Sequence, residues 1–405
     1  MIRNWPRIAF FSVFCAVVCG NVTASAQTLA LVGGSVYASP EATPLPDAIV
    51  VTSGGAITAI GRRGEVQIPT DARVIDCTGK TVVAGFWNSH VHFTQEPWRN
   101  AANAPVASLE EHMREMLTKW GFPTVSDLGS DPSDTLPLRR RIYAGEVAGP
   151  NIFMAGSIFP KGGHPVYLPA EMKLPEAATP DEAAQMARGY LAIGLDGMKL
   201  FTGAYMGSKP VVNMDVAVAK AAVDVTHAQG KPVFAHPQNQ IGVDTVIAAG
   251  VDILAHTSPG QPTTAEQLAQ FKLHGTALIP TLALFTTVVL DPGTTARLVE
   301  SGVGQLRAFS DNGGAVLFGT DVGFTKLYDT TLEYELMHRA LSERQVLASL
   351  TTNPAQYFKA AKKGRVEKGF DADLAVLDGD PIADVRNLAK VAYTLRAGQI
   401  IYQKP

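Results

Sequence analysis

Four histidines and one aspartate stand where short apolar segments of the chain end: His90, His92, His236, His256 and Asp321. His90 and His92 are two residues apart, so on an extended backbone both imidazoles point to the same face. Imidazole nitrogens and a carboxylate oxygen are ligands that zinc and similar divalent ions prefer. Any one of these histidines alone is more typical of a packed core residue. Together the five predict a metal centre.

The segments that would position these residues form a repeating pattern. Eight apolar segments alternate with helical patterns: Val82–Phe86, Thr124–Leu128, Asn151–Ala155, Gly197–Phe201, Pro232–His236, Asp252–His256, Ala277–Thr281 and Val316–Asp321. Helix starts between them carry capping patterns of Ser or Thr followed three residues later by Glu or Gln, at Ser108, Thr179, Thr263 and Ser342. The alternation predicts a (β/α)8 TIM barrel, whose site lies at the C-terminal ends of the strands.

Short β-branched segments separated by glycine turns precede and follow this region. We therefore expect an α/β protein in which both chain ends build a small β-sandwich domain and the barrel is inserted between them. The predicted boundaries are 27–84 for the first part of the β domain, 85–360 for the barrel and 361–405 for the second part.

The first 26 residues have the pattern of a secretory signal peptide. Arg3 and Arg7 precede an apolar run, and the small residues Ala24, Ser25 and Ala26 resemble a cleavage site. The run is too short for a spanning helix, and no later segment approaches one. We expect an exported protein, periplasmic or secreted, without a membrane span after removal of the peptide. An uncleaved N-terminal anchor stays open as the alternative.

Composition excludes several classes of protein. The 405 residues are 46% hydrophobic with a formal charge of −3, which argues against a disordered chain and against a nucleic-acid-binding surface. Three cysteines are too few for a disulfide scaffold, and no CxxC pair offers a cysteine zinc site. Of the three, Cys77 lies in the predicted β domain, where it would pack as a small apolar residue. The oligomeric state is left open, a homo-oligomer included.

Four motifs closely resemble those of the amidohydrolase superfamily. They are the segments 85–92, GFWNSHVH, 319–321, GTD, 351–355, TTNPA, and 369–378, GFDADLAVLD. The resemblance covers essentially the whole chain after the signal peptide. It is to the binuclear branch of dipeptidases and N-acyl amino acid hydrolases, which is related to imidazolonepropionase.

This resemblance implies two divalent ions, zinc by the ligand chemistry. His90, His92 and Asp321 would bind one ion and His236 and His256 the other. Lys199 would bridge them as a carbamate formed with CO2. The alternative, a surface lysine, fits poorly with its apolar neighbours Met198 and Leu200. A hydroxide shared by the ions would attack the substrate carbonyl, with Asp321 as the catalytic proton acceptor and donor.

Substrate-binding residues are also implied. In similar dipeptidases a histidine after two glycines, here His164, polarises the substrate carbonyl or contacts its carboxylate; a loop histidine without a role is the alternative. Relatives often carry Tyr or His shortly after the fifth-strand ligand, whereas this chain has Gln238 in that run, and Tyr167 and Tyr205 in neighbouring loops could substitute. Arg99 would pair with a substrate carboxylate, unless it is a solvated rim residue. The remaining histidines, His112, His227, His274 and His338, fall within or near predicted helices.

The predicted function is hydrolysis of a C–N amide bond in a small molecule, a dipeptide or an N-acyl amino acid. A cyclic-amide, lactone or ester hydrolase with the same metal centre is the alternative. A mononuclear deaminase would need an acid/base Glu near His236, and the run 236–239, HPQN, contains none. A non-catalytic binding protein is disfavoured by the complete ligand set.

Overall fold

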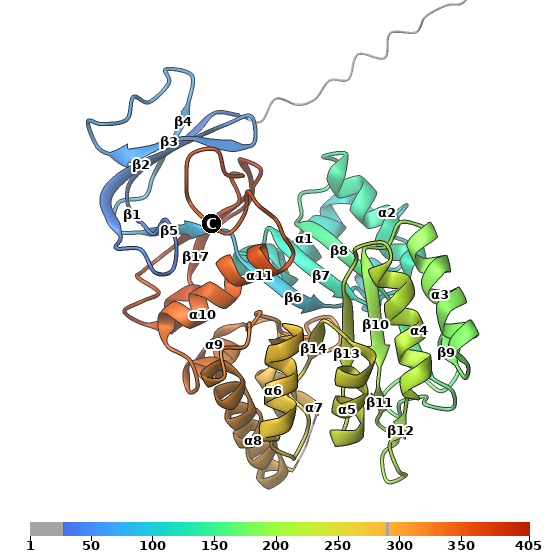
Figure 1. Cartoon of the computed structure of the whole chain (residues 1–405). Coiled ribbons are helices and arrows are strands. Elements are labelled where there is room, and N and C mark those ends of the chain that lie inside the picture. The colour runs from blue at the N-terminus through green and yellow to red at the C-terminus, as the bar shows by residue number, and fades with distance from the viewer. Residues whose placement is uncertain (1–26, 289–290) are drawn as a thin grey trace, which may run out of the picture.

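The computed structural model describes residues 27–288 and 291–405, which form two eight-stranded sheets and surrounding helices (Figure 1). One sheet is built from both chain ends, and the other is the barrel. The predicted signal peptide lies outside the described residues. No helix in the described part of the chain has the length and apolar character needed to cross a membrane.

The sheet from the chain ends, here called the terminal sheet, joins the two ends through one strand pair. Its strands are β1 (Leu29–Val36), β2 (Leu45–Ser53), β3 (Ala56–Arg62), β4 (Arg73–Asp76), β5 (Thr81–Ala84), β16 (Leu374–Leu377), β17 (Val391–Arg396) and β18 (Gln399–Gln403). The order is β18-β17-β16-β5-β1-β2-β3, with β4 beside β1. Antiparallel pairing of β5 with β16 connects the N-terminal and C-terminal parts of this sheet.

Apolar side chains cover both faces of the terminal sheet. Along β1, Leu29 and Leu31 belong to one buried cluster, and Ala30 and Val32 belong to another. This alternation is the period of a strand between two apolar layers. Cys77 lies in the first cluster, fully buried, and burial raises the pKa of its thiol to about 12. It packs as the small apolar residue that was expected.

The barrel is parallel. Its regular strands, in the order in which they pair, are β6 (Trp87–Val91), β7 (Thr124–Leu128), β8 (Asn151–Pro160), β10 (Gly197–Phe201), β13 (Val233–His236), β14 (Ile253–Ala255) and β15 (Ala277–Ile279). Residues 315–322 take the eighth position: Val316 bridges to Leu278 of β15, and Val322 bridges to Val91 of β6. The predicted α/β fold, with a barrel inserted into a β domain, is thus confirmed.

Three short strands accompany the barrel. The strand β9 (Glu176–Ala177) pairs with the end of β8, and β11 (Gly203–Ala204) pairs with β12 (Val212–Asn213). All three lie in the segments that follow β8 and β10, on the side where these strands end. They belong to the longer loops around the site.

The prediction of Val82–Phe86 as the first barrel strand is wrong. Residues 81–84 form β5 of the terminal sheet, and the barrel begins with β6, three residues after the end of β5. A continuous apolar run fits either sheet, because a fully buried strand has no alternation to show which sheet it joins. The chain passes from one sheet to the other at Gly85, where a Cβ would lie 2.3 Å from Cγ of Pro123.

Helices surround the barrel (Figure 1). They are α1 (Val106–Met116), α2 (Pro132–Tyr143), α3 (Pro180–Ala192), α4 (Val216–His227), α5 (Gln240–Ala249), α6 (Ala265–His274), α7 (Phe285–Val288), α8 (Pro292–Asp311), α9 (Thr331–His338), α10 (Glu343–Leu350) and α11 (Thr352–Tyr357). The four histidines expected in or near helices, His112, His227, His274 and His338, lie in α1, α4, α6 and α9.

Two of the four predicted helix caps are confirmed as capping boxes, at Thr179 and Ser342. The third is displaced by one residue, because Thr264 rather than Thr263 caps α6. The fourth is wrong, since α1 begins at Val106 and Ser108 lies inside its first turn. Pro105 precedes this helix, and its fixed φ allows the helix to start before the serine.

Candidate metal centre and active site

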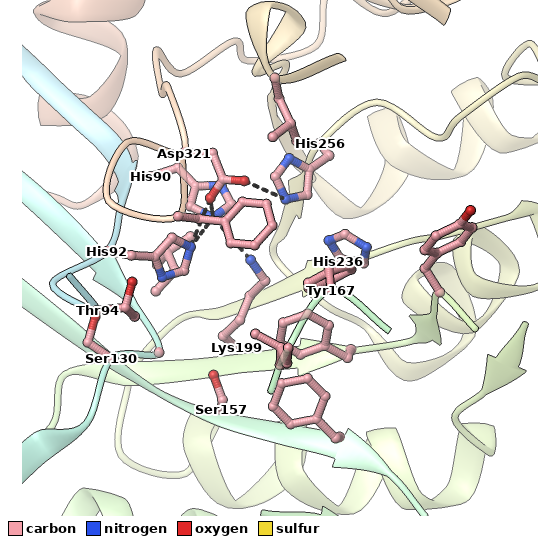
Figure 2. Close-up of a pocket in the computed structure, with 18 of the residues that line it drawn as sticks. His90, His92, Thr94, Ser130, Ser157, Tyr167, Lys199, His236, His256 and Asp321 are labelled. Atoms are coloured by element: carbon pink, nitrogen blue, oxygen red, sulfur yellow. Dashed lines mark hydrogen bonds and ion pairs between the residues drawn. The ribbon is translucent and has the colours of Figure 1, made fainter. Parts of the chain in front are cut away.

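A cavity of about 1470 Å³ opens at the C-terminal ends of the barrel strands. All six predicted metal ligands line it, namely His90, His92, Lys199, His236, His256 and Asp321. Figure 2 shows Lys199 pointing between His90 and His92 on one side and His236 on the other. The strand ends therefore bring together the residues that the sequence places far apart.

His90, His92 and Asp321 form the tightest group. The Nε2 atoms of the two histidines are 3.2 Å apart, and Asp321 Oδ1 lies 3.2 Å from His90 Nε2 and 2.8 Å from His92 Nε2. Their ligand atoms all lie within 4.8 Å of one another. Asp321 Oδ1 is buried and accepts no hydrogen bond from the described residues, although two ring nitrogens face it. A cation fits such a group, because it satisfies the carboxylate and both imidazoles at once.

Backbone contacts between β6 and the eighth position hold this group. The backbone N–H of Asp321 donates to the carbonyl oxygen of His90 at 2.9 Å, and Asp321 adopts a left-handed φ of 59°. Gly319 permits this approach, since a Cβ there would lie 2.8 Å from Cβ of His90. The strained backbone turns the carboxylate of Asp321 toward the histidines.

Asn88, which was not predicted as a site residue, is buried and supports the metal-ligand group. Its side-chain amide donates to Thr320 Oγ1 at 2.8 Å, and its Oδ1 accepts the backbone N–H groups of Thr320 and His90. It thereby ties the strand that carries the histidines to the segment that carries Asp321. The motif 85–92 contains Asn88, but a single polar residue within a strand has no spacing that would reveal this contact.

Lys199 lies on β10 and is 1% exposed. Its Nζ is 3.3 Å from His90 Nε2 and 5.5 Å from the centroid of the Phe201 ring. Burial lowers the pKa of Lys199 to about 8, and the nearby carboxylate of Asp321 opposes this shift. The surface-lysine alternative is therefore wrong: the amine lies inside the barrel, beside the metal-ligand candidates.

His256 is held in one tautomer by Thr281. The Thr281 hydroxyl donates to the carbonyl oxygen of Pro280 at 2.8 Å, so at 2.6 Å from His256 Nδ1 its oxygen must accept from that nitrogen. We therefore assign the proton of His256 to Nδ1, which leaves the Nε2 lone pair directed into the site. That Nε2 is 4.0 Å from Asp321 Oδ2. A hydrogen-bonded far nitrogen is the usual support of a metal-binding histidine.

Glu333, on α9, fixes the backbone that follows Thr281. Its carboxylate accepts the backbone N–H groups of Leu282 at 2.9 Å and Ala283 at 2.7 Å, immediately after Thr281. Thr281 itself has a left-handed φ of 45°. Glu333 is 1% exposed, and burial raises its pKa to about 7. Neither Thr281 nor Glu333 could be predicted from the sequence, because no motif connects them with His256.

His236 lies less close to the group. Its ring centroid is 4.8 Å from that of His256, but its Nε2–H donates to Gln238 Oε1 at 3.1 Å. The structure thus places His236 at the site wall with Gln238 beside it. Among the described residues, only His90, His92 and Asp321 meet as a compact ligand group.

The electrostatics of the site favour neutral imidazoles. Burial, and secondarily the charge of Lys199, holds the pKa of His90 well below its ordinary value and lowers the pKa of His236 to about 4. Burial, and then the charge of His236, lowers the pKa of His256 well below its ordinary value. A neutral imidazole keeps one nitrogen lone pair, and this is the state in which histidine binds a metal.

The predicted substrate-binding residues separate into two sets. Tyr167, Tyr205, Gln238 and Arg99 line the cavity. The side chain of Arg99 is 68% exposed and pairs with Glu96 at 3.2 Å, so it lies on the outer rim. His164 is not among the described residues that line the cavity. Its ring nitrogens lie 3.2 Å and 3.1 Å from the carbonyl oxygens of Pro165 and Met172.

Comparison with known proteins agrees with this fold. The model of the amidohydrolase family matches residues 81–401. Two mycobacterial proteins without an assigned function, Mb2939c of Mycobacterium bovis and Rv2915c of Mycobacterium tuberculosis, are each 29% identical over 262 residues. These matches cover 61% of this chain and 65% of each relative, so the aligned part spans just under two thirds of the relatives' length.

Solved structures resemble the chain over nearly its whole length. A candidate prolidase from Bifidobacterium longum has a TM-score of 0.80 and 27% identity, covering 94% of this chain and 95% of that one. A Xaa-Pro dipeptidase with bound methionine has a TM-score of 0.79 and 24% identity, covering 93% and 100%. Molinate hydrolase, with a TM-score of 0.77 and 19% identity over 93% and 95%, shares the fold.

The chain belongs to the amidohydrolase family. Its group of His90, His92 and Asp321 offers ligands for a divalent ion of the kind that amidohydrolases generally use.

Proposed function

We propose that the protein hydrolyses the C–N bond of a small amide at a site that holds two divalent ions, with zinc as the metal. The observation that carries this proposal is the buried, unsatisfied Oδ1 of Asp321 beside the ring nitrogens of His90 and His92. His90, His92 and Asp321 would hold one ion. His236 and His256 would hold the second, and six ligands in total exceed one tetrahedral site.

Lys199 would complete the site as a carbamate. Its free amine adds to CO2 to give the carbamate anion and one proton, and the two carbamate oxygens could then serve one ion each. The position of Nζ, fully buried and 3.3 Å from His90 Nε2, supports this role. An ammonium at that position would instead lie against neutral rings without a bonded carboxylate, which is unfavourable in a buried site.

Divalent ions bound there would lower the pKa of a coordinated water toward neutrality and polarise the substrate carbonyl. The chain's own residues supply the proton transfer. The carboxylate of Asp321 takes a proton from the attacking water and delivers it to the leaving nitrogen, so that the acyl C–N bond breaks and an acid and an amine leave. The support of Asn88 and Thr281 keeps the surrounding side chains oriented while this occurs.

Dipeptides and N-acyl amino acids are the substrates that the family resemblance suggests. Two solved structures with the same fold are named for prolidase or Xaa-Pro dipeptidase activity, and this supports a place among amide hydrolases. Cyclic amides, lactones and esters suit the same ligand set and stay as the second candidate class. Export to the periplasm or the outside, by removal of residues 1–26, is part of the proposal.

The test is metal removal and reconstitution combined with a substrate panel. The purified chain would be stripped with a chelator, titrated with zinc, and assayed against dipeptides, N-acyl amino acids, simple amides, lactones and esters. We expect activity to disappear with the metal and to return with zinc, with amides cleaved fastest. Full activity in the chelated protein would contradict the metal-dependent mechanism, and exclusive cleavage of lactones or esters would contradict the C–N bond.

A further inference from the structure

Large apolar side chains gather around the entrance of the cavity, five of them in loops and one at the end of α7. Six of the twelve exposed large apolar residues in the described chain lie there, here called the mouth: Val166, Tyr167, Met172, Tyr205, Val288 and Phe324. All except Val166 line the cavity, and the backbone N–H of Val166 donates to the carbonyl oxygen of Tyr205. Scattered apolar residues are ordinary on a protein surface, but a contiguous group at a cavity entrance marks a binding surface.

Apolar side chains continue from the mouth toward the metal ligands. Tyr167 and Phe324 meet at the entrance with their ring centroids 5.1 Å apart. Deeper in the cavity, Phe159 and Phe201 stack with centroids 3.9 Å apart, and Phe201 in turn lies beside His236. A substrate can therefore keep an apolar group in contact with the wall from the reacting carbonyl to the outside.

The charged side chains of the cavity do not favour a carboxylate near the reacting bond. Three cations line the cavity in the described chain. Lys199 belongs to the metal site, Arg99 lies on the rim paired with Glu96, and Lys173 is exposed. The acidic residues Asp131, Asp134 and Asp291 also line its outer part.

In a dipeptide or an N-acyl amino acid the carboxylate is one carbon from the scissile nitrogen, so it would be buried near the ligands. A buried carboxylate needs a paired cation or several donors. His164, the residue that resemblance offers for this role, has both ring nitrogens against backbone carbonyls. The rim acids would in addition repel an approaching anion.

We propose that the substrate is an uncharged amide with a bulky apolar group, such as a medium-length acyl chain or an aromatic ring, and that its leaving group carries no carboxylate. The apolar group lies along Phe201 and Phe159 and emerges between Tyr167 and Phe324. This inference rests on the proposed function, because it takes the metal-ligand group as the place where the C–N bond breaks.

The experiment uses the zinc-loaded full chain and three matched amides: N-octanoylglycinamide, N-octanoylglycine and N-acetylglycinamide. Hydrolysis of the acyl C–N bond gives the fatty acid or acetate and the free amine. We expect kcat/KM for N-octanoylglycinamide to exceed that of either comparison compound by about tenfold or more, the range that a few methylenes or one unpaired buried charge supply. Preference for N-octanoylglycine, or equal rates for the acetyl and octanoyl amides, would overturn the proposal.

A variant of the mouth sharpens the test. Phe324→Ser should raise KM for N-octanoylglycinamide several-fold, on the order expected for lost apolar contact, and should raise KM for N-acetylglycinamide much less. Leu273→Ser is the matched control, because Leu273 is 74% exposed on α6 and does not line the cavity. Equal effects of Phe324→Ser on both amides would contradict an apolar path through the mouth.

Binding separates failure of this inference from failure of the proposed function. Calorimetric titration of the same three compounds into the zinc-loaded Asp321→Asn chain, in which turnover should be slow, measures affinity apart from the hydrolysis assayed in the wild type. Tighter binding of N-octanoylglycinamide without hydrolysis of any compound would support the substrate class and refute the proposed chemistry. Tighter binding of N-octanoylglycine would refute the substrate class, whether or not an amide is cleaved.

Discussion

The floor and the mouth of the cavity are built on different principles. The floor consists of buried polar side chains at strand ends, among them His90 and Asp321, each fixed by backbone or side-chain hydrogen bonds. The mouth consists of exposed apolar side chains, most of them on loops, among them Tyr167 and Phe324. This difference indicates that side chains at the barrel strand ends determine the reaction, whereas side chains at the entrance determine which molecules reach the site.

Among substitutions at the floor of the cavity, Asp321→Asn should cause the largest fall in kcat. Asparagine keeps the size and one ligating oxygen but cannot accept the proton. We expect metal content to fall little and kcat to fall by a factor on the order of 10²–10⁴, the usual contribution of a positioned general base. Elemental analysis and steady-state kinetics on the same sample measure both quantities. Near-wild-type kcat in a fully metallated variant would reduce Asp321 to a ligand.

Lys199→Ala should cause the second largest loss of activity. If the carbamate bridges two ions, the variant loses one of them and most of its activity, and short carboxylic acids such as acetate partly restore both by supplying two oxygens. Lys220→Ala, which removes an exposed lysine on α4, is the control. A Lys199→Ala protein with two ions and full activity would show that the buried lysine has no role in the metal site.

Much of the floor was predictable from the sequence. Strand ends are visible as apolar segments that stop at a polar residue, and His236, His256 and Asp321 each stand at such an end. The prediction of His90 and His92 as a pair at a strand end is correct although the bounds of the strand are wrong. β6 carries His90 and is followed by His92. The error at residues 82–86 concerns which sheet an apolar run joins, and this is decided by pairing partners distant in sequence.

The residues that orient the metal ligands and the residues of the mouth could largely not be predicted from the sequence. Asn88, Thr281 and Glu333 act through hydrogen bonds that the tertiary fold creates, and no local pattern predicts these bonds. Tyr167 and Tyr205 were placed near the site from their loops, but the position of His164 depends on a ring orientation that sequence does not encode. Loop conformation follows from tertiary contacts rather than from periodicity.

Thr281→Val should have an intermediate effect. Valine matches the shape of threonine and keeps the β-branch, but it removes the oxygen that accepts from His256 Nδ1. Loss of such a support commonly costs about 10–100-fold in metal affinity or activity. Zinc titration followed by activity measures this loss. Thr226→Val, at a buried threonine in α4 away from the cavity, should change neither quantity. Unchanged zinc affinity in Thr281→Val would contradict the tautomer assignment.

Glu333→Gln should have the smallest effect on chemistry and a pH-dependent effect on stability. Burial raises the pKa of Glu333 from its ordinary value of 4.5 to about 7, so the folded chain holds a proton that the unfolded chain releases between these pH values. The contribution of this group to the free energy of unfolding therefore decreases as pH rises through that window, by about 3 kcal/mol.

Urea unfolding of wild type and Glu333→Gln at several pH values between 4.5 and 7 isolates this contribution. The difference in unfolding free energy, wild type minus variant, should decline with increasing pH, since the other titrating groups are shared by both proteins. A difference that stays constant across the window would contradict the raised pKa of Glu333.

The most direct test of the account is the metal stoichiometry of the chain. Elemental analysis of protein stripped with a chelator and then saturated with zinc should find about two ions per chain, and about one in His236→Ala, because that variant removes one ligand of the second ion. One ion or fewer in the wild type at saturating zinc would contradict the binuclear site on which the proposed mechanism depends.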